Sequence, residues 1–327
     1  MYKQKNNNEK KAYSHSITLL VFTLFLICCS EEDHQHRYSE TTTFISDTTS
    51  INNLNPKNDT TIILDSTSIS NLNPKNDSSI IRTTSFFMDS IIVAHWNIGH
   101  FSNGKSDDTT ISNDSIGSKQ NSYRKFIEDA QADIFGVCEY SPNFDQDGNS
   151  ARDAIFYTYD YASIGEKVRY NCNSIFTRGI PFIDEHQFLF DERAQFRYYS
   201  TVNLMINNDT IRFVETHLDW NEGSNGSKYR LSQMQKLIDT FKCYTHVIIC
   251  ADFNIANNSE YDIFKEAGFC LANCGDNGIF YTYPASNPDS ALDNIIVRGF
   301  NIKKVSTLRD PNLSDHCLIK CVLTIQE

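Results

Sequence analysis

Residues 246–254 read HVIICADFN. The run from His246 to Cys250 has the length of one strand and is apolar from Val247 onward without alternation, which indicates a buried strand. It leads into Ala251-Asp252-Phe253-Asn254, so a carboxylate and an amide follow the end of the strand. The same arrangement, an apolar strand that ends at a polar side chain, recurs along the chain.

Strand and helix patterns are mixed over the C-terminal part of the chain. Apolar runs of strand length occupy residues 91–96, 134–138, 294–297 and 317–325. Asn207-Asn208-Asp209 suits the turn of a hairpin between residues 197–206 and 210–216. Helical spacing of apolar residues occurs at 123–130 and 228–243, and a short helix is expected between Ser259 and Gly268. Because hairpins and strand–helix units occur together, we predict one α/β domain with mixed sheets.

The predicted strands meet carboxylate, amide or imidazole side chains at their ends. These residues are Asn97, Glu139, His217, Asp252 with Asn254, Asp293, and the pair Asp315-His316. Carboxylate oxygens bind Mg²⁺ well, and one or two of them with water and phosphate oxygens are enough. A histidine beside an aspartate is a base whose tautomer the carboxylate sets. Together these residue types predict metal-assisted attack of water on a phosphorus centre.

Each of these motifs has an ordinary structural interpretation when it is taken alone. Ser314-Asp315-His316 and Asp252-Phe253-Asn254 are common turn or cap sequences. A strand histidine such as His217 is more often a satisfied structural residue, and Glu139 after an apolar strand is equally a solvated end. The functional interpretation therefore depends on the occurrence of all the motifs, in this order, on one chain.

The order of the motifs resembles that of the endonuclease/exonuclease/phosphatase superfamily. That superfamily includes deoxyribonuclease-I-like enzymes, neutral sphingomyelinases, inositol polyphosphate phosphatases and deadenylases. The resemblance extends from about Asp89 to the C-terminus. It implies a deoxyribonuclease-I-like α/β fold: a four-layer α/β/β/α sandwich with two packed mixed β-sheets and the site at one edge of them. It also implies a metal-dependent phosphodiesterase or phosphatase.

The resemblance assigns a metal site to residues at three strand ends. Glu139 is expected to ligate Mg²⁺, with Mn²⁺ as the alternative ion, and Asn97 is expected to lie beside it. Asp315 is expected to support the metal, either as a ligand or from behind the ligands.

The resemblance also assigns the catalytic steps. His316 is the expected general base, oriented by Asp293. Asp252 is expected to orient or help activate the attacking water, and Asn254 to hold a phosphate oxygen. His217 is expected either to stabilise charge that develops on the phosphate oxygens or to protonate the leaving group. The division of roles among Asp252, Asp293 and His316 stays open at the level of sequence.

The substrate class has several alternatives. A net charge of -12 excludes a basic protein that wraps polyanions, but not an enzyme that meets phosphate through a cation. The leading prediction is hydrolysis of a phosphodiester such as nucleic acid. The alternatives are a sphingomyelinase, a sugar-phosphate or inositol-phosphate phosphatase, and, in another class, a catalytically inactive surface-binding lipoprotein. Five basic residues are interpreted either as phosphate contacts or as solvated surface charges: Lys228, Arg230, Lys303, Lys304 and Arg309.

Residues 1–29 are predicted to be a lipoprotein signal peptide. Lysines precede an apolar run at 17–27 that is much shorter than the about 20 residues of a spanning helix. Leu26-Ile27-Cys28-Cys29-Ser30 resembles a bacterial lipobox, with Cys29 as the lipid-modified residue and Cys28 as the alternative. An ordinary cleaved signal peptide and a single anchor helix are the other interpretations. The resemblance implies export and a lipid anchor in the bacterial outer membrane, and the acidic residues that follow resemble a surface-export signal.

Residues 30–88 are predicted to be a disordered tether. The segment is rich in Ser, Thr, Asn and Asp and has almost no aromatic residues, so it cannot bury enough apolar surface to offset the entropy of ordering. It holds a short imperfect duplication, residues 50–63 and 68–81, and both copies contain LNPKND. Two short copies cannot stack into a solenoid. We therefore place the catalytic domain, expected to be a monomer, at residues 89–327.

Overall fold

The computed structural model describes residues 87–102, 119–141, 150–166, 168, 171–190, 197–221, 223–255 and 257–326. The predicted signal peptide with Cys29 lies outside the described residues, as does nearly all of the predicted tether. The domain boundaries 1–29, 30–88 and 89–327 therefore remain predictions. Within the described part of the chain, no helix combines the length and the hydrophobicity needed to cross a bilayer.

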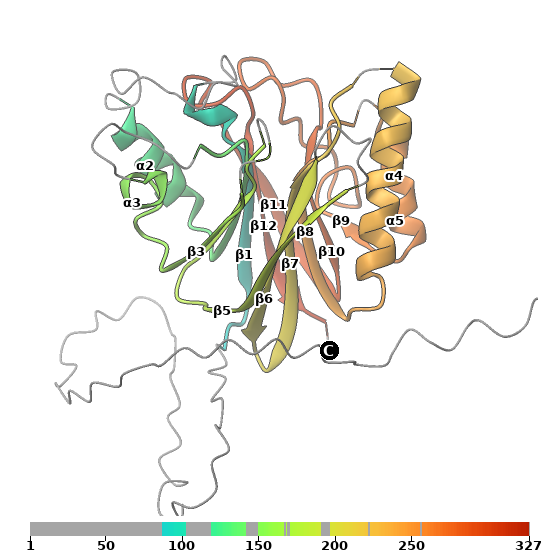
Figure 1. Ribbon diagram of the computed structural model, residues 1–327, viewed down its shortest axis with the longest axis horizontal. Coiled ribbons are helices and arrows are strands. Elements are labelled where there is room, and N and C mark those ends of the chain that lie inside the picture. Colours follow the sequence, from blue (N-terminus) through green and yellow to red (C-terminus); the bar gives the residue numbers. More distant parts are fainter. Residues whose placement is uncertain are drawn as a thin grey trace, which may run out of the picture. The chain divides into compact units, whose positions relative to one another are not determined.

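Two six-stranded sheets form the centre of the domain (Figure 1). The first sheet has the order β11 (Phe300–Leu308), β12 (Leu318–Ile325), β1 (Ile91–Asn97), β2 (Ile134–Cys138), β4 (Ser174–Thr177) and β3 (Tyr161–Ile164). The second has the order β5 (Phe182–Leu189), β6 (Tyr198–Ile206), β7 (Asp209–His217), β8 (His246–Asp252), β10 (Asp293–Arg298) and β9 (Cys270–Leu271). Each sheet is mixed, because β1 runs parallel to β2, and β7 to β8, while their other neighbours are antiparallel.

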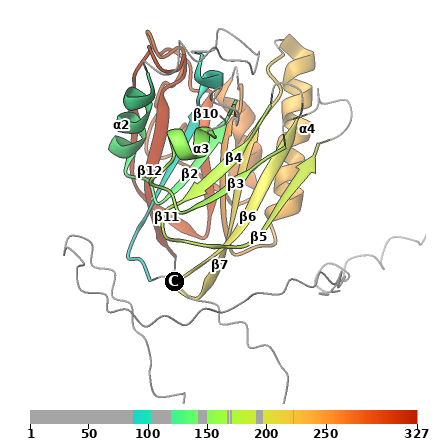
Figure 2. The ribbon, with the colours of Figure 1, turned by 60° about the vertical axis from the view of Figure 1, so that its left-hand side comes forward.

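Helices cover the outer face of each sheet (Figures 1 and 2). α2 (Gln120–Ala130) and α3 (Ala151–Ala154) pack on the first sheet, whereas α4 (Gly223–Phe241) and α5 (Asp262–Glu266) pack on the second. The 3-10 turn η2 (Gly99–Phe101) follows β1, and a second 3-10 turn, η3 (Asn258–Tyr261), precedes α5. The layers are therefore helix, sheet, sheet and helix, which confirms the predicted α/β/β/α sandwich.

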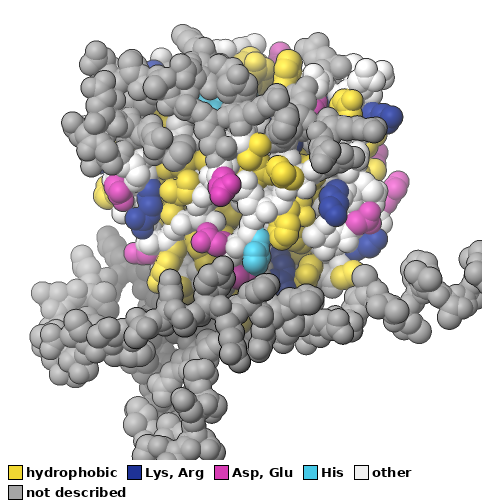
Figure 3. Space-filling view, viewed as in Figure 1, with side chains coloured by type: hydrophobic (Ala, Val, Ile, Leu, Met, Phe, Trp, Pro, Cys, Tyr) yellow, Lys and Arg dark blue, Asp and Glu magenta, His cyan; other side chains and the backbone are white. Residues whose placement is uncertain are grey.

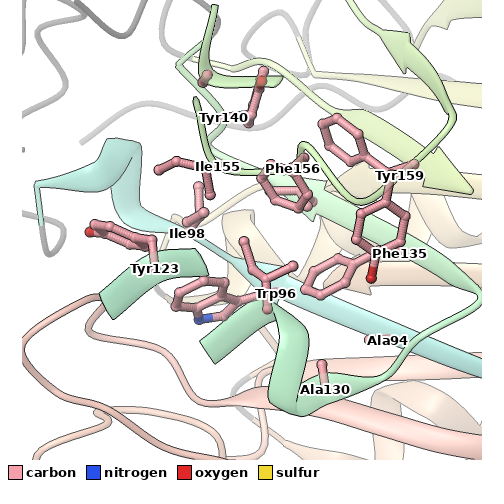
Figure 4. Packing of buried hydrophobic residues seen from close by; sticks show 14 of the residues in the cluster. Ala94, Trp96, Ile98, Tyr123, Ala130, Phe135, Tyr140, Ile155, Phe156 and Tyr159 are labelled. Carbon is pink, nitrogen blue, oxygen red and sulfur yellow. The ribbon is translucent and has the colours of Figure 1, made fainter. Parts of the chain in front are cut away.

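The side chains of each central strand alternate between two apolar layers. In β1, Ile91 and Val93 enter the core between the sheets, whereas Trp96 packs outward near α2, with its ring 6.0 Å from that of Tyr123. Figure 4 shows this outer layer, in which Trp96, Tyr123 and Phe135 gather on one side of the first sheet. Because both faces of the central strands are covered, β8 is buried along its whole length, as its unbroken apolar run predicts.

Local patterns locate the central strands but not the edges of the sheets. β2 has the predicted bounds, and the β6–β7 hairpin turns at Asn207 and Asn208, whose φ angles of 55° and 67° belong to a left-handed two-residue turn. Five strands have no predicted counterpart: β3, β4, β5, β9 and β11. They are short, or, like β5 and β11, they carry many exposed polar residues, so their apolar runs are weak.

Candidate active site

The polar side chains at the strand ends meet at one edge of the two sheets, the upper edge in Figure 1. Parallel pairing brings the ends of β1 and β2 together and pairs His217 with Asp252 at the ends of β7 and β8. β10 runs antiparallel to β8, so its first residue, Asp293, also pairs with Asp252. β12 runs antiparallel to β1, and the segment that leads into it brings His316 to the same edge.

Asp252 occupies the centre of the site and is 1% exposed. Its Oδ2 accepts a hydrogen bond from Asn97 Nδ2 (3.0 Å), and its Oδ1 accepts one from the backbone N–H of Asn254 (2.9 Å). The Nε2 atoms of His217 and His316 lie 3.4 and 3.7 Å from the same Oδ2. Burial raises the pKa of Asp252, against the opposing charge of His316. One carboxylate thus joins residues of both sheets.

His316 and Asp293 form a close pair, with 2.9 Å between Nδ1 and Oδ2. The turn that holds His316 is anchored on the end of β1, because Ser314 Oγ donates to a β1 carbonyl (2.7 Å) and Trp96 Nε1 donates to the His316 carbonyl (3.0 Å). Burial alone lowers the pKa of His316, but the Asp293 and Asp252 carboxylates raise it to about 10. Asp293 thereby directs the other ring nitrogen, Nε2, toward Asp252, which is the arrangement of a base with its orienting carboxylate.

Glu139 follows β2 in a left-handed backbone conformation, with φ 50°. That conformation costs a residue with a side chain about 1–2 kcal/mol, and such residues cluster at functional sites. The carboxylate lies 3.6 Å from His100 Nε2 and 3.7 Å from His217 Nδ1. Burial raises the pKa of Glu139 to about 7, and the negative charges of Asp252 and Asp315 add to the effect.

The donors around Glu139 fit a divalent cation. The negative charges of Asp252 and Asp315 act on the Glu139 carboxylate, and no lysine in the described ranges forms an ion pair with any of the three. Hard oxygen donors in excess over nearby positive charge are what small divalent cations bind. Two groups of possible ligand atoms among the described residues lie within 4.8 Å of one another: Asp252, Asp293 and His316, and, deeper between the sheets, His95, Cys138 and Glu215.

The remaining predicted residues reach the same edge with contacts of their own. Asn97 Oδ1 accepts a backbone N–H from the following turn (3.0 Å), while its Nδ2 faces Asp252. Asn254 has a φ of 51°, and its Nδ2 donates to a backbone carbonyl just after β7 (3.3 Å). Asp315 is half-buried, and its backbone carbonyl accepts a backbone N–H from the loop before β10 (2.5 Å). The structure therefore brings together every residue proposed for the site from sequence.

Arg197 is a residue of the site that the sequence interpretation misses. It precedes β6, is 5% exposed and donates through Nη1 to Asn171 Oδ1, whereas its buried Nε has no partner among the described residues. Its charge acts on Glu139 and Asp252. Burial lowers the pKa of His217 well below its usual value, and the Arg197 charge lowers it further. In the sequence, Arg197 directly precedes a buried strand. The prediction from sequence used the polar residues that follow or begin apolar strands and did not consider this arginine.

Of the five basic residues considered as phosphate contacts, one has structural contacts and four are exposed. Arg230 is buried, pairs with Glu260 (3.1 Å between Nε and Oε2) and donates to backbone carbonyls just after β7. The others are exposed: Lys228, Lys303, Lys304 and Arg309. On the face drawn in Figure 3, basic and acidic side chains are interspersed and do not form one basic patch. Among the described residues, Arg197 and His316 supply positive charge that acts on the Glu139 carboxylate.

Solved structures share this fold at low sequence identity. An endonuclease/exonuclease/phosphatase from Bacteroides vulgatus is 19% identical, with a TM-score of 0.58 over 72% of this chain and 99% of that chain. A mannosyl-6-phosphatase from Bacteroides thetaiotaomicron is 20% identical, with a TM-score of 0.55 over 72% of this chain and 100% of that chain. D. rerio TDP2, complexed with a single strand DNA product, is 14% identical, with a TM-score of 0.56 over 72% and 100%.

Sequence comparison identifies the family. No curated protein sequence matches the chain. The profile of the endonuclease/exonuclease/phosphatase family, however, matches residues 94–316, which is more than half of the chain and includes every residue of the site described above. The chain therefore belongs to the endonuclease/exonuclease/phosphatase family.

Proposed function

We propose that the protein is a Mg²⁺-dependent hydrolase that directs water onto a phosphodiester, as a nuclease does. One observation supports the proposal above the others: Asp293 and His316 lie 2.9 Å apart, and the free ring nitrogen of His316 faces Asp252 within a cluster of buried carboxylates. This arrangement places an oriented base, His316, beside carboxylates that suit a cation. Membership of a family of phosphodiesterases and phosphatases supports the same reaction class.

The base side of the reaction belongs to His316. The neutral ring, which a bound cation would favour by lowering the pKa of His316, accepts the proton of the attacking water at Nε2, and Asp293 stabilises the imidazolium that forms. Asp252, 3.7 Å from that nitrogen, orients the water. Glu139 and Asn97, with Asp315 in support, would hold the Mg²⁺ ion, which would supply polarisation of a phosphate oxygen and offset the charge of the carboxylates.

Arg197, His217 and Asn254 bind the phosphate and stabilise the charge that develops on it. A guanidinium offers paired donors that match phosphate oxygens, and Arg197 has a buried Nε without a partner among the described residues. The lowered pKa of His217 keeps its ring neutral, so that it donates a hydrogen bond. This favours stabilisation of the developing charge over protonation of the leaving group.

A sugar-phosphate or inositol-phosphate phosphatase is the second candidate. Its support is the shared fold with a mannosyl-6-phosphatase, whereas the shared fold with TDP2 in complex with DNA supports the phosphodiester proposal. A sphingomyelinase, which hydrolyses a lipid phosphodiester, is the third enzyme candidate. Every residue proposed for the site is present, which speaks against a catalytically inactive surface-binding lipoprotein.

The first experiment incubates the full-length protein with supercoiled plasmid and Mg²⁺, with and without a chelator. Asp252→Ala is the matched inactive variant. Nicking that the chelator and the substitution both abolish supports the nuclease proposal. Phosphate release from mannose 6-phosphate without nicking moves the assignment to the phosphatase candidate. Failure of the folded protein on phosphodiesters, sphingomyelin and sugar phosphates alike contradicts the hydrolase proposal.

We also propose that the protein is an exported monomer, anchored to the bacterial outer membrane by a lipid on Cys29. The support is the short apolar segment and the lipobox-like sequence around Cys29. Labelling with radioactive palmitate in the native host tests the anchor. Loss of label in Cys29→Ser, but not in Cys28→Ser, is expected, and the reverse pattern moves the lipid to Cys28.

A further inference from the structure

A buried histidine lies directly behind the proposed catalytic pair. His95 belongs to β1, is 0% exposed and is enclosed between the two sheets. Its Nδ1 lies 3.0 and 3.2 Å from the two carboxylate oxygens of Glu215, and its Nε2 lies 3.2 Å from Asp293 Oδ1. Glu215 belongs to β7 and Asp293 to β10, so a residue of the first sheet bridges two strands of the second.

Farther from the site edge, the residues of β1 and β7 on the same inward face are apolar. Ile91 and Val93 precede His95 on the inward face of β1, and the β7 residues that precede Glu215 on the same face are apolar as well. Replacement of a buried ion pair by apolar side chains is often neutral or stabilising, so such a pair is weak evidence for stability. A fully buried imidazole and carboxylate next to an active site therefore point to a role in the site.

The first sheet makes room for the Glu215 carboxylate. Gly136 of β2 pairs with His95, and a Cβ added at Gly136 would lie 1.9 Å from Glu215 Oε2 and 2.9 Å from its Cδ. The carboxylate thus occupies the space of a missing side chain. Glycine inside a strand weakens the strand and often marks a close approach. Here the close approach is that of the group that holds His95.

The contacts of Asp293 show what His95 does. Its Oδ1 faces His95 and its Oδ2 faces His316. Its backbone N–H donates to Thr282 Oγ1 (3.1 Å). Both ring nitrogens of His95 face carboxylate oxygens, an arrangement in which both donate. A carboxylate held at both oxygens cannot rotate, so the ring of His316 has one orientation.

We propose that His95, held in place by Glu215, is a positioning residue that fixes Asp293 and, through Asp293, the His316 base. His95 touches neither the water nor the phosphate, and its effect passes through two hydrogen bonds. The activity readout of this inference rests on the proposed function, whereas its structural readout does not.

The kinetic test compares two substitutions with a matched control. His95→Asn removes the bridge, and Glu215→Gln keeps the size of the side chain but removes its charge. Hydrogen-bond partners that orient metal-bound histidines are typically worth about 10- to 100-fold in activity, and we expect a similar factor for the orientation of a base, so His95→Asn should lower kcat by about that factor with KM nearly unchanged. Glu215→Gln should have a smaller effect in the same direction. The control is His246→Asn, at the opposite end of β8, whose histidine is also buried and should leave kcat unchanged.

A double substitution separates positioning from general damage. In a His316→Ala background, His95→Asn should cost no further activity, because the base that it positions is gone. An equal loss in the presence and absence of His316 overturns the proposal.

A spectroscopic readout works without any substrate. In NMR spectra of the full-length protein, the His316 Nδ1–H hydrogen-bonded to Asp293 should give a protected signal. That signal should broaden or exchange faster in His95→Asn and Glu215→Gln, but not in His246→Asn. An unchanged signal and unchanged kcat in a folded His95→Asn refute the inference. If His95→Asn does not fold, the same two measurements on Glu215→Gln test the inference. If the protein cleaves no substrate, the NMR signal of His316 alone tests it.

Discussion

Replacement of Asp293 by asparagine tests the catalytic pair most directly. Asp293 Oδ2 lies 2.9 Å from His316 Nδ1, and Oδ1 lies 3.2 Å from His95 Nε2. A carboxylate accepts from both histidines, whereas a carboxamide has one oxygen and one NH₂ group. In Asp293→Asn, one of the two histidines must therefore face a donor. The substitution keeps the shape of the side chain and removes both its charge and half of its accepting capacity.

The expected magnitude follows from the charges around His316. The carboxylates raise the pKa of His316 from an ordinary value of about 6.5 to about 10, although burial acts in the opposite direction. Asp293 is nearer than Asp252, 2.9 Å against 3.7 Å, and contributes the larger share. An opposite charge at such a distance typically moves a pKa by about 1–3 pH units, so Asp293→Asn should lower the pKa of His316 by that amount.

The two consequences for activity have opposite directions. A base works when it is deprotonated, so a lower pKa moves the rising limb of the pH–rate curve to lower pH. The maximal kcat should nevertheless fall by about a thousandfold or more, because the ring loses its orientation and tautomer. NMR titration of His316 in chelated protein measures the pKa, and a pH–rate curve with Mg²⁺ measures the limb. Asp289→Asn, at an exposed aspartate of the loop before β10, is the control.

A folded Asp293→Asn variant with an unchanged pKa of His316 and wild-type kcat would refute the assignment of base and orienting carboxylate. If the pKa of His316 falls but kcat stays at the wild-type value, Asp293 and His316 are electrostatically coupled, but His316 does not act in the rate-limiting step.

Four further predictions address the rest of the site. Asp252→Ala should lower kcat by about a hundredfold or more without a change in circular dichroism, and wild-type turnover would remove Asp252 from the site. A chelator should abolish activity and Mg²⁺ or Mn²⁺ should restore it, with Glu139→Gln requiring about tenfold more metal; activity in chelator would contradict metal dependence. Arg197→Ala should lower kcat/KM by about 10- to 100-fold, the worth of one charge-assisted hydrogen bond, and an unchanged kcat/KM would leave Arg197 a structural residue. Gly136→Ala should destabilise the fold by about 1–3 kcal/mol in thermal unfolding, since its Cβ would meet Glu215 at 1.9 Å, and an unchanged melting temperature would contradict that packing.

The central strands could be predicted because their signal is local. β1, β2 and β8 are covered on both faces, so each appears as a continuous apolar run. The edge strand β5 has most of its side chains in solvent, and its sequence resembles that of a loop. The absence of a predicted counterpart for β3, β5 and β11 follows from their places at the edges of the sheets.

The candidate site could be predicted as a set of residues but not as an arrangement. Asp252, Asp293 and His316 each follow or precede an apolar strand, so their positions along the chain are informative. Which of them touch depends on the pairing of β8 with β10 and on the course of β12. The contact of 2.9 Å between His316 and Asp293, which identifies the first as the base and the second as its orienting carboxylate, is set by the tertiary structure.

The amino-acid sequence by itself determined the fold class, the family and the strand-end residues, because each is encoded in short segments whose order is enough. Only the tertiary structure decided that the buried guanidinium of Arg197 acts on Glu139 and Asp252 and that His95 and Glu215 lie behind Asp293. His95 is 120 positions from Glu215 and 198 from Asp293, and these residues meet only because two sheets stack with a particular register. No local pattern encodes that stacking, since burial of apolar surface between the sheets, and not any single motif, sets it.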